Sequence, residues 1–262
     1  MDFDSIGIDT DERSGRVVAL PDGTQGVAEA VKLARREGTC VLPWSLAAGT
    51  ELPELPAAAV WLSTERIGGV REVAPADLVA VAGAGVPAGL LAEAAAEHGL
   101  FWPVADLVAG ATTVGETVET APGNWTLLGN LLRRSSLAIE VVLADGAVLR
   151  TGARTVKWVT GYDLRQLFIG SRGTLGIVTE ATLRLDAIAN REHLMARYRD
   201  DFEDLEAGGP VVMGEAGPGE SAAPPPVHDA APDGSLVLLE RLKREFDPDG
   251  VLAPLAVLNA RL

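Results

Sequence analysis

Cysteine, histidine and basic residues are scarce in this 262-residue sequence, and each shortage excludes a class of protein. The single cysteine, Cys40, cannot form an internal disulfide and lies in an apolar run, so we expect a buried thiol without a catalytic role. The three histidines lie far apart, and no His or Cys pair has the spacing of a metal site. A formal net charge of −15 argues against nucleic-acid binding, which requires a basic face.

Long apolar segments are also lacking. No uninterrupted apolar run reaches the length of a membrane span, so we expect no direct span. The first residues, MDFDSIGIDTDERSGR, have neither the basic nor the apolar region of a signal peptide, which makes the cytoplasm the default location. Hydrolase chemistry has no positive signal either, because Ser135, Ser136 and Ser171 have no nucleophile-elbow motif around them.

Two β-branched runs enclose the most patterned part of the chain. Residues 139–143 are apolar, and residues 176–185 alternate with a period of two, which predicts strands with one buried face. Asp145-Gly146 follows the first run as a hairpin turn does. Between the runs, Gly170, Gly173 and Gly176 recur every third residue. Glycine permits close approaches that a Cβ forbids, so this loop is a candidate ligand cradle.

The remaining elements alternate between strands and helices. Thr24 is expected to cap a helix over residues 25–37, whose apolar positions have helical spacing and which Gly38 ends. Strands at 17–20 and 39–42 flank this helix as an α/β unit. We further expect strands at 59–62, after Val70 and at 78–82, helices at 87–98, 164–168, 190–206 and 236–246, and a loop over 106–123.

These elements carry a family resemblance. ADG, TVKWVTGYDL and LFIGSRGTLGIVTEATLRL, in this order, resemble the FAD-linked oxidases of the vanillyl-alcohol oxidase and p-cresol methylhydroxylase superfamily. The most similar branch is the smaller FAD-binding subunit of bacterial glycolate oxidase, with D-lactate dehydrogenases nearby. The resemblance runs from about residue 18 to 187 and returns at 238–254. It implies an α+β fold, a two-lobed FAD-binding domain of the p-cresol methylhydroxylase type with a rudimentary C-terminal extension.

The resemblance also divides the chain. Family members normally insert a large cap domain that supplies much of the substrate pocket, but here only the residues around 188–235 are available, and many are Pro, Gly or Ala. We therefore expect a strongly shortened cap. The expected parts are a loose segment at 1–15, an FAD-binding domain at 16–187 with lobes at about 16–75 and 76–187, a reduced cap and linker at 188–235, and a C-terminal helix and tail at 236–262.

The pyrophosphate of FAD is a dianion that clustered backbone N–H groups can hold. The family's first loop, P-x-G-G-G-T, corresponds to residues 43–50, where Pro43 and the pair Gly49-Thr50 are kept and the intervening glycines are lost. Two interpretations stay open, a weakened pyrophosphate nest and an ordinary surface loop. From this loop the resemblance assigns to the cofactor Pro43, Ser45, Leu46, Ala47, Ala48, Gly49 and Thr50.

A second family loop corresponds to residues 110–123. Here Glu116 replaces an amide and Glu119 replaces a threonine. A carboxylate about 4 Å from a phosphate costs roughly 1–4 kcal/mol, so both glutamates argue against tightly held FAD. From this loop and the glycine-rich third element the resemblance assigns to the cofactor Gly110, Ala111, Thr112, Thr113, Gly115, Glu116, Gly173, Gly176, Ile177 and Val178.

Two further features have more than one interpretation. Arg172 stands where the family commonly has glutamate, so it either pairs with Glu116, Glu119 or a phosphate, or is a solvated surface arginine. The stretch GAGVPAG at 83–89 is similar to a dinucleotide fingerprint, but its third glycine is displaced and Pro87 suits a helix start. We expect a connection between lobes there.

The resemblance implies the FAD-binding subunit of a flavin-dependent oxidoreductase that acts on a 2-hydroxy acid such as glycolate or lactate. Its expected partners are a larger flavoprotein subunit and an iron–sulfur subunit. No catalytic base can be named, because the cap that would carry it is shortened. The alternative is a non-catalytic structural partner subunit of the same fold that has lost FAD binding.

Any FAD should be bound non-covalently, because none of the histidines lies in the first loop, where some relatives attach the flavin. Acid or heat precipitation of FAD-loaded protein should therefore leave intact flavin in the supernatant, measured by its absorbance. Flavin that stays with the denatured polypeptide would contradict this prediction.

Overall fold

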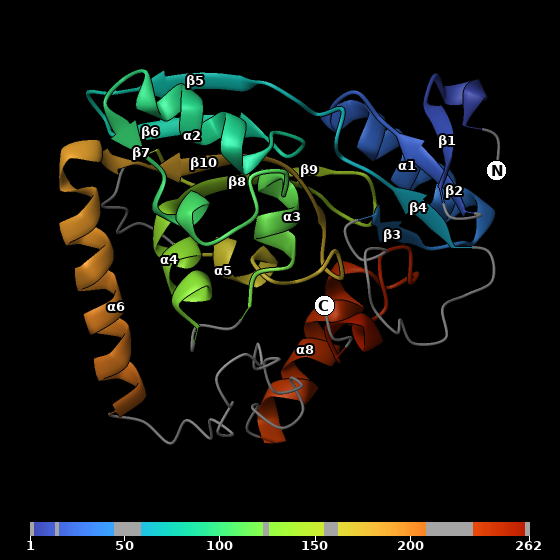
Figure 1. The fold of residues 1–262 in the computed structure, drawn as a ribbon. Coiled ribbons are helices and arrows are strands. Elements are labelled where there is room, and N and C mark those ends of the chain that lie inside the picture. Colours follow the sequence, from blue (N-terminus) through green and yellow to red (C-terminus); the bar gives the residue numbers. More distant parts are fainter. Residues whose placement is uncertain are drawn as a thin grey trace.

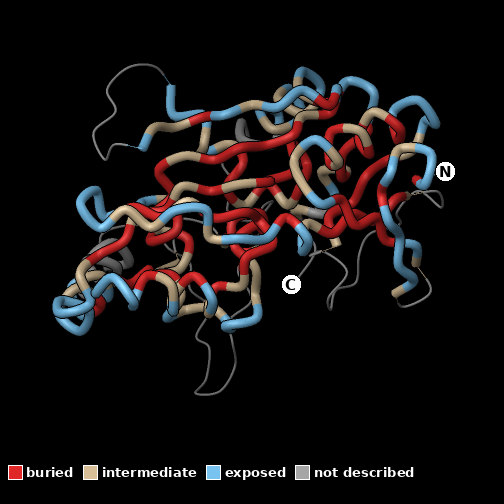
Figure 2. Tube along the Cα trace, turned by 90° about the horizontal axis from the view of Figure 1, so that it is seen from above, coloured by how far each residue is buried: buried red, intermediate tan, exposed pale blue. Residues whose placement is uncertain are grey.

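The computed structural model describes residues 3–13, 16–44, 59–122, 126–154, 162–207 and 233–259. Figure 1 shows two sheets side by side, with most of the helices packed around the second sheet and the C-terminal helix below. Buried residues follow the strands at the centre, and exposed residues follow the outer turns (Figure 2). The architecture mixes helices and sheets, as the sequence predicts.

The first sheet has four strands in the order β1-β2-β4-β3, and both β2 and β3 run parallel to β4. The sequence predicts a loose segment before residue 16, but β1 pairs antiparallel with β2. Its side chains are polar and mostly exposed, so the pairing is made by backbone groups and leaves no hydrophobic pattern to detect. The strands are β1 Asp9–Arg13, β2 Arg16–Leu20, β3 Val41–Pro43 and β4 Val60–Leu62, preceded by the short helix η1 Asp4–Ile6.

Helix α1, Thr24–Glu37, crosses between β2 and β3 and buries the predicted apolar face against the first sheet. Gly38 ends it in the left-handed conformation with φ 66°, as predicted. Thr24 does not cap the helix. Its Oγ1 instead donates a hydrogen bond to Oε1 of Glu140 in the second sheet at 2.5 Å, and Gly23 occupies the cap position. The predicted cap is therefore wrong, because a buried carboxylate competes for the threonine hydroxyl.

The second sheet is antiparallel throughout, in the order β5-β6-β10-β8-β9. The two enclosing runs predicted as strands are β8 and β10, and they pair at its centre. The predicted hairpin turn is confirmed, since Gly146 has φ 79° and its N–H donates to the carbonyl of Leu143 at 2.9 Å. The strands are β5 Val70–Ala74, β6 Val79–Gly83, β8 Ser136–Val142, β9 Val148–Gly152 and β10 Ile177–Arg184, and the pair β7 Leu100–Phe101 and β11 Asp186–Ala187 lies apart.

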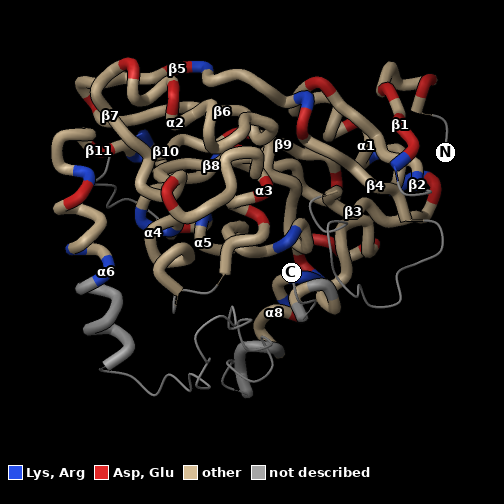
Figure 3. Tube along the Cα trace, viewed as in Figure 1, with Lys and Arg blue, Asp and Glu red and all other residues tan. Residues whose placement is uncertain are grey.

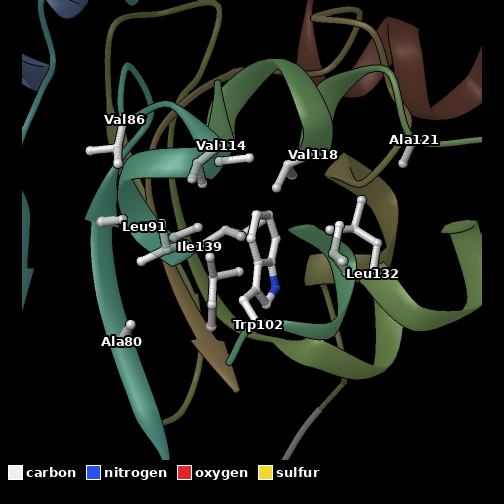
Figure 4. Close-up of a cluster of buried hydrophobic side chains, with 14 of the residues drawn as sticks. Ala80, Val86, Leu91, Trp102, Val114, Val118, Ala121, Leu132 and Ile139 are labelled. Carbon is white, nitrogen blue, oxygen red and sulfur yellow. The ribbon is translucent and has the colours of Figure 1, made fainter. Parts of the chain in front are cut away.

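Short helices pack around the indole of Trp102, which is fully buried. Figure 4 shows Val114, Val118 and Leu132 around the ring. The loop predicted over 106–123 is wrong in part, because Val114 and Val118 bury one turn of helix in this core. The helices are α2 Ala88–Ala96, η3 Pro103–Asp106, α3 Val114–Glu119, α4 Leu127–Ser135 and α5 Arg165–Phe168.

The predicted C-terminal helices are present. Residues 208–232, most of the predicted linker, lie outside the described residues. Cys40 is buried and unpaired, as expected, and burial raises the pKa of its thiol. The elements are η4 Ile188–Asn190, α6 Arg191–Ala207, α8 Asp233–Phe246 and η5 Leu255–Asn259.

The side chain of Lys243 joins α8 to the rest of the molecule. Its ammonium donates to the carbonyl oxygens of Thr174 and Ala253, both at 2.9 Å, and to the carboxylate of Asp247. Asp247 in turn accepts the N–H of Val251 at 2.7 Å. Burial lowers the pKa of Lys243, and Asp247 opposes that shift. The ammonium therefore ties the glycine-rich loop to the chain that follows α8.

Lys243→Met should destabilise the protein by about 3–5 kcal/mol, because it removes one partner of a buried ion pair and leaves the carboxylate of Asp247 without its cation. Urea unfolding measures the change. Arg244→Met is the matched control, since that neighbouring side chain is 72% exposed. Equal effects of both substitutions would show that the buried contacts of Lys243 contribute nothing specific.

Candidate functional site

A pocket of about 200 Å³ opens between the first sheet and α3. It lies at the carboxyl ends of β3 and β4, two buried parallel strands whose following residues meet at one sheet edge. Ligands of open α/β sheets bind outside the carboxyl ends of the strands. The first turn of α3 forms the opposite wall. The lining residues are Pro43, Trp44, Leu62, Ser63, Thr64, Glu65, Thr113, Glu116 and Glu119.

The first turn of α3 is closed by a capping box. Oγ1 of Thr113 accepts the N–H of Glu116 at 3.2 Å, and Oε2 of Glu116 accepts the N–H of Thr113 at 3.5 Å. The Glu116 carboxylate is therefore drawn back onto the helix start and into the pocket wall. Burial raises the pKa of Glu116 above its ordinary value, and the hydrogen bond from the Thr113 N–H opposes that shift.

The glycine-rich loop between α5 and β10 lies against the end of α3. The N–H of Arg172 donates to the carbonyl of Glu119 at 2.8 Å. The Glu119 side chain is also buried, with only 3% of the residue exposed, and its Oε1 accepts the N–H of Val178 at 2.9 Å. This carboxylate therefore occupies a backbone donor that the resemblance assigns to the cofactor.

Two consecutive residues of this loop have left-handed backbone, Arg172 with φ 51° and Gly173 with φ 72°. A non-glycine residue in that region is strained by roughly 1–3 kcal/mol, and such strain clusters at ligand sites. A Cβ at residue 173 would lie 2.3 Å from Cγ of Pro43. Only glycine lets the loop reach the end of β3, so the first and third predicted cofactor segments meet here.

Gly83 and Gly85, in the stretch that resembles a dinucleotide fingerprint, pack against the loop after β4 that lines the pocket. A Cβ at Gly83 would lie 2.3 Å from the carbonyl oxygen of Ile67. A Cβ at Gly85 would lie 2.4 Å from the carbonyl oxygens of both Thr64 and Glu65. Both glycines therefore serve the close approach of β6 to the loop after β4, and the protein's own backbone fills the space that a phosphate would need. This packing favours the predicted connection between lobes.

Glu65 at the pocket is paired with Arg13. The contact is bidentate, with Nη1 to Oε2 at 2.7 Å and Nη2 to Oε1 at 2.5 Å, and it lowers the pKa of Glu65. The same guanidinium lies 5.8 Å from the ring centroid of Trp44, which meets Trp61 edge to face. A cation and an aromatic ring therefore stand beside the segment that leads into the first loop.

The residues that line the pocket include segments that the family uses for FAD. Their carboxylates, however, disfavour binding of the anionic cofactor. The pocket volume is below the ~300–1,000 Å³ of typical small-molecule sites, and the chain that continues from Trp44 lies outside the described residues. Figure 3 shows acidic positions on α3. Arg13 balances Glu65, whereas Glu116 and Glu119 keep their carboxylates bonded to backbone N–H groups at the wall. We therefore expect a site that accepts FAD with residual repulsion.

The structure separates the predicted cofactor residues into groups. Pro43, Thr113 and Glu116 line the pocket. Ser45, Leu46, Ala47, Ala48, Gly49 and Thr50 lie outside the described residues. Gly110 and Thr112 accept backbone hydrogen bonds from the start of α2, with Ala111 exposed between them. Gly115 packs on Ala84, Gly176 packs on Phe168, and Ile177 and Val178 are fully buried in β10.

The sequence analysis did not predict Trp44 or the run of residues 62–65 as part of the site. A signal was present, because Val60–Leu62 is a buried apolar strand followed directly by Ser63, Thr64 and Glu65. Polar residues after a strand that runs parallel to its neighbour mark the ligand edge of a sheet. That rule needs the strand pairing, which only the fold supplies.

A mixed sheet with a parallel core and an antiparallel sheet, which meet at glycine-containing loops, define a two-lobed FAD-binding fold of the p-cresol methylhydroxylase type. The chain belongs to the FAD binding domain family, which matches residues 15–152. Its cofactor is accordingly FAD. The predicted fold class and resemblance are confirmed by this match.

Curated relatives agree with the family. A D-lactate dehydrogenase from Archaeoglobus fulgidus is 35% identical over 170 residues, 64% of this chain and 38% of the relative. A D-2-hydroxyglutarate dehydrogenase from Stutzerimonas stutzeri is 32% identical over 190 residues, 72% of this chain and 41% of the relative. Glycolate oxidase subunit GlcD of Bacillus subtilis is 35% identical over 145 residues, 55% of this chain and 30% of the relative. The chain thus matches less than half the length of each.

Among solved structures, an alkyldihydroxyacetonephosphate synthase aligns with a TM-score of 0.51 at 19% identity. The alignment covers 65% of this chain and 31% of that chain, and it supports the fold alone. No helix among the described residues has the length and apolar character needed to cross a membrane. The same residues contain no group of three or more His, Cys, Asp and Glu side chains placed to hold a metal ion.

Glu116→Gln should tighten FAD binding by about fivefold, or on the order of 1 kcal/mol, because it removes a charge near the pyrophosphate and keeps an N3 side chain able to cap. Fluorescence titration with FAD gives the dissociation constant. Glu93→Gln on the exposed face of α2 is the control for the change in net charge.

The raised pKa of Glu116 adds a pH dependence to the same titration. As the pH falls, this carboxyl takes up its proton earlier than an ordinary glutamate and the repulsion is lost. Wild-type affinity for FAD should therefore rise as the pH falls through that pKa, and the Glu116→Gln variant should lose this component. An unchanged affinity and pH profile in the variant would show that Glu116 does not interact with the cofactor.

Proposed function

We propose that this chain is the FAD-binding subunit of an oxidoreductase that acts on a 2-hydroxy acid. The observation that carries the proposal is the pocket where the end of β3, the loop after β4 and the start of α3 meet. Two of these are segments that the family uses for FAD. The substrate class is supported by the relatives, because D-lactate, D-2-hydroxyglutarate and glycolate, the compounds in their names, are all 2-hydroxy acids.

In this proposal the chain's own residues bind and orient the cofactor. Pro43 lines the pocket at the end of β3, and the glycine at position 173 lets the third element approach it closely. Thr113 and Ser63 supply hydroxyl groups at the wall. Bound FAD supplies the acceptor for a hydride from the carbinol carbon of the substrate, and the protein's task is to position it and to set its electrostatic environment.

Substrate-binding groups and the electron acceptor come from partner chains in this proposal. A larger flavoprotein subunit and an iron–sulfur subunit are the expected partners, supported by the similarity to a glycolate oxidase subunit. His98 and His193 are exposed at the end of α2 and on α6, so neither serves as a base in the pocket. The FAD is bound non-covalently, and the complex works in the cytoplasm.

The buried carboxylate of Glu119 favours a second candidate function. Its Oε1 accepts the N–H of Val178 at 2.9 Å, so this backbone donor already has a partner within the chain. In this alternative the chain is a structural partner subunit that has lost the cofactor. Purified protein distinguishes the two, because the FAD-binding subunit takes up added FAD and becomes yellow, whereas the structural subunit stays colourless.

The FAD-loaded single chain should show a flavin spectrum but no appreciable dye reduction with glycolate, D-lactate or D-2-hydroxyglutarate. Hydride transfer requires the carbinol carbon held against the flavin and a base for the hydroxyl proton, and the proposal assigns those groups to a partner. A turnover assay with an artificial acceptor measures this, with the co-expressed complex as the positive control. Robust turnover by the single chain would show that it builds a complete site. A chain that stays colourless after FAD is added would support the role of a structural partner subunit.

A further inference from the structure

The strand β1 contacts the surroundings of the candidate FAD site, although it precedes the part of the chain that matches the family. The match to the FAD binding domain family begins at residue 15, whereas β1 spans Asp9–Arg13. Figure 1 shows β1 at the outer edge of the first sheet, where it pairs antiparallel with β2. Any role of β1 at the pocket is therefore an addition to the matched domain.

The side chain of Arg13 carries this contact. Its guanidinium donates to both carboxylate oxygens of Glu65, at 2.7 and 2.5 Å, and lies 5.8 Å from the ring centroid of Trp44. Nε of the same guanidinium donates to the carboxylate of Asp11 at 3.0 Å within β1. Among the described residues, those that line the pocket include Glu65 and Trp44 and not Arg13. The guanidinium therefore lies behind the carboxylate, and its route to the pocket is through Glu65.

Glu65 is held at the pocket wall by a second set of contacts. Oγ of Ser63, a buried residue, donates to Oε2 of Glu65 at 3.2 Å and accepts the N–H of Glu65 at 3.3 Å. The glycine at position 85 lets the chain after β6 pack closely on the backbone carbonyl of Glu65. These contacts keep the carboxylate at the wall, so its charge acts on a ligand in the pocket unless a cation compensates it.

The charge of Glu65 opposes the ligand that the family binds, because the pyrophosphate of FAD is a dianion. Like charges about 4 Å apart repel strongly enough at surface-like dielectric to change a Kd at least severalfold. A bidentate guanidinium engages both carboxylate oxygens at once, which a lysine cannot do. The hydrogen bonds from Arg13 lower the pKa of Glu65, so this carboxylate is ionised at neutral pH.

We infer that Arg13 is a positioning residue of the cofactor site, which holds and compensates the carboxylate of Glu65 and so lets the pocket accept the anionic part of FAD. Arg13 acts through Glu65 and makes no contact with FAD. The strand β1 is then a working part of the site outside the matched domain. The inference rests on the FAD binding of the proposed function and does not depend on which 2-hydroxy acid is oxidised.

Fluorescence titration of the full chain with FAD tests the inference in a double-mutant cycle of Arg13 and Glu65. Arg13→Gln should raise the Kd for FAD about fivefold, because Glu65 loses its cation. In the Glu65→Gln background, Arg13→Gln should change the Kd by less than about twofold, because no carboxylate is left for the guanidinium to hold. All titrations use one ionic strength, since salt screens exposed charges.

Arg66→Gln is the matched control. Nη1 of Arg66 donates to the carboxylate of Asp9 at 2.5 Å, so this pair also joins β1 to the loop after β4. The substitution changes the net charge as Arg13→Gln does, but Arg66 does not line the pocket and does not hold Glu65 by a hydrogen bond among the described residues. It should leave the Kd within about twofold of wild type. Urea unfolding checks that both variants are folded.

The outcomes separate this inference from the proposed function. The inference alone is overturned if the wild-type chain binds FAD and Arg13→Gln leaves the Kd unchanged. It is also overturned if Arg13→Gln weakens binding equally in both backgrounds, or if Arg66→Gln weakens binding as much as Arg13→Gln. A folded wild-type chain that takes up no FAD would overturn the proposed function and this inference together.

Discussion

The buried carboxylate of Glu140 is the interaction on which the arrangement of the two sheets depends. Glu140 lies in β8 and accepts hydrogen bonds from Thr24 of α1 at 2.5 Å, Thr179 of β10 at 2.9 Å and Arg150 of β9 at 2.6 Å. Burial acts to raise the pKa of Glu140, but these hydrogen bonds hold it below its ordinary value. Removing any donor would leave a charge partly uncompensated in the interior, which is costly. One carboxylate therefore couples the helix of the first sheet to three strands of the second.

Buried hydrophobic side chains also connect the two sheets. The cluster around α1 contains Val142 and Ile177 from the second sheet and Ala144 from the β8–β9 turn, as well as residues of the first sheet. The hairpin turn at Gly146 packs on α1, where a Cβ would lie 3.0 Å from the carbonyl of Ala28. One hydrophobic cluster thus contains residues of both lobes.

Glutamates line the candidate FAD pocket. This lining is unexpected in a chain of the FAD binding domain family, because the pyrophosphate of FAD is a dianion. Each glutamate is held by donors of the chain itself, Glu65 by Arg13, Glu116 by the N–H of Thr113 and Glu119 by the N–H of Val178. In the proposed FAD site, these carboxylates therefore already have partners within the chain.

Much of this architecture was predictable from periodicity and turn chemistry. The strands β8 and β10, the turn at Asp145-Gly146 and the helix end at Gly38 depend on neighbours in sequence, so a local pattern reveals them. Helix α3 is not predicted because its apolar residues are stabilised by the core around Trp102, which is formed by residues distant in sequence. The residues of its capping box are also common in loops, so they do not identify a helix start by themselves. β1 was missed because backbone pairing alone forms it. The loss of the Thr24 cap depended on a carboxylate 116 residues away.

The sequence by itself determined the family, because ordered motifs of glycine and apolar residues survive as local patterns. Tertiary structure alone decided where the glutamates point and which donors they occupy. It also brought Ser63 and Glu65 to the carboxyl edge of the first sheet. These outcomes depend on contacts between residues far apart in the chain, where hydrogen-bond geometry and burial compete, and no local pattern encodes that competition.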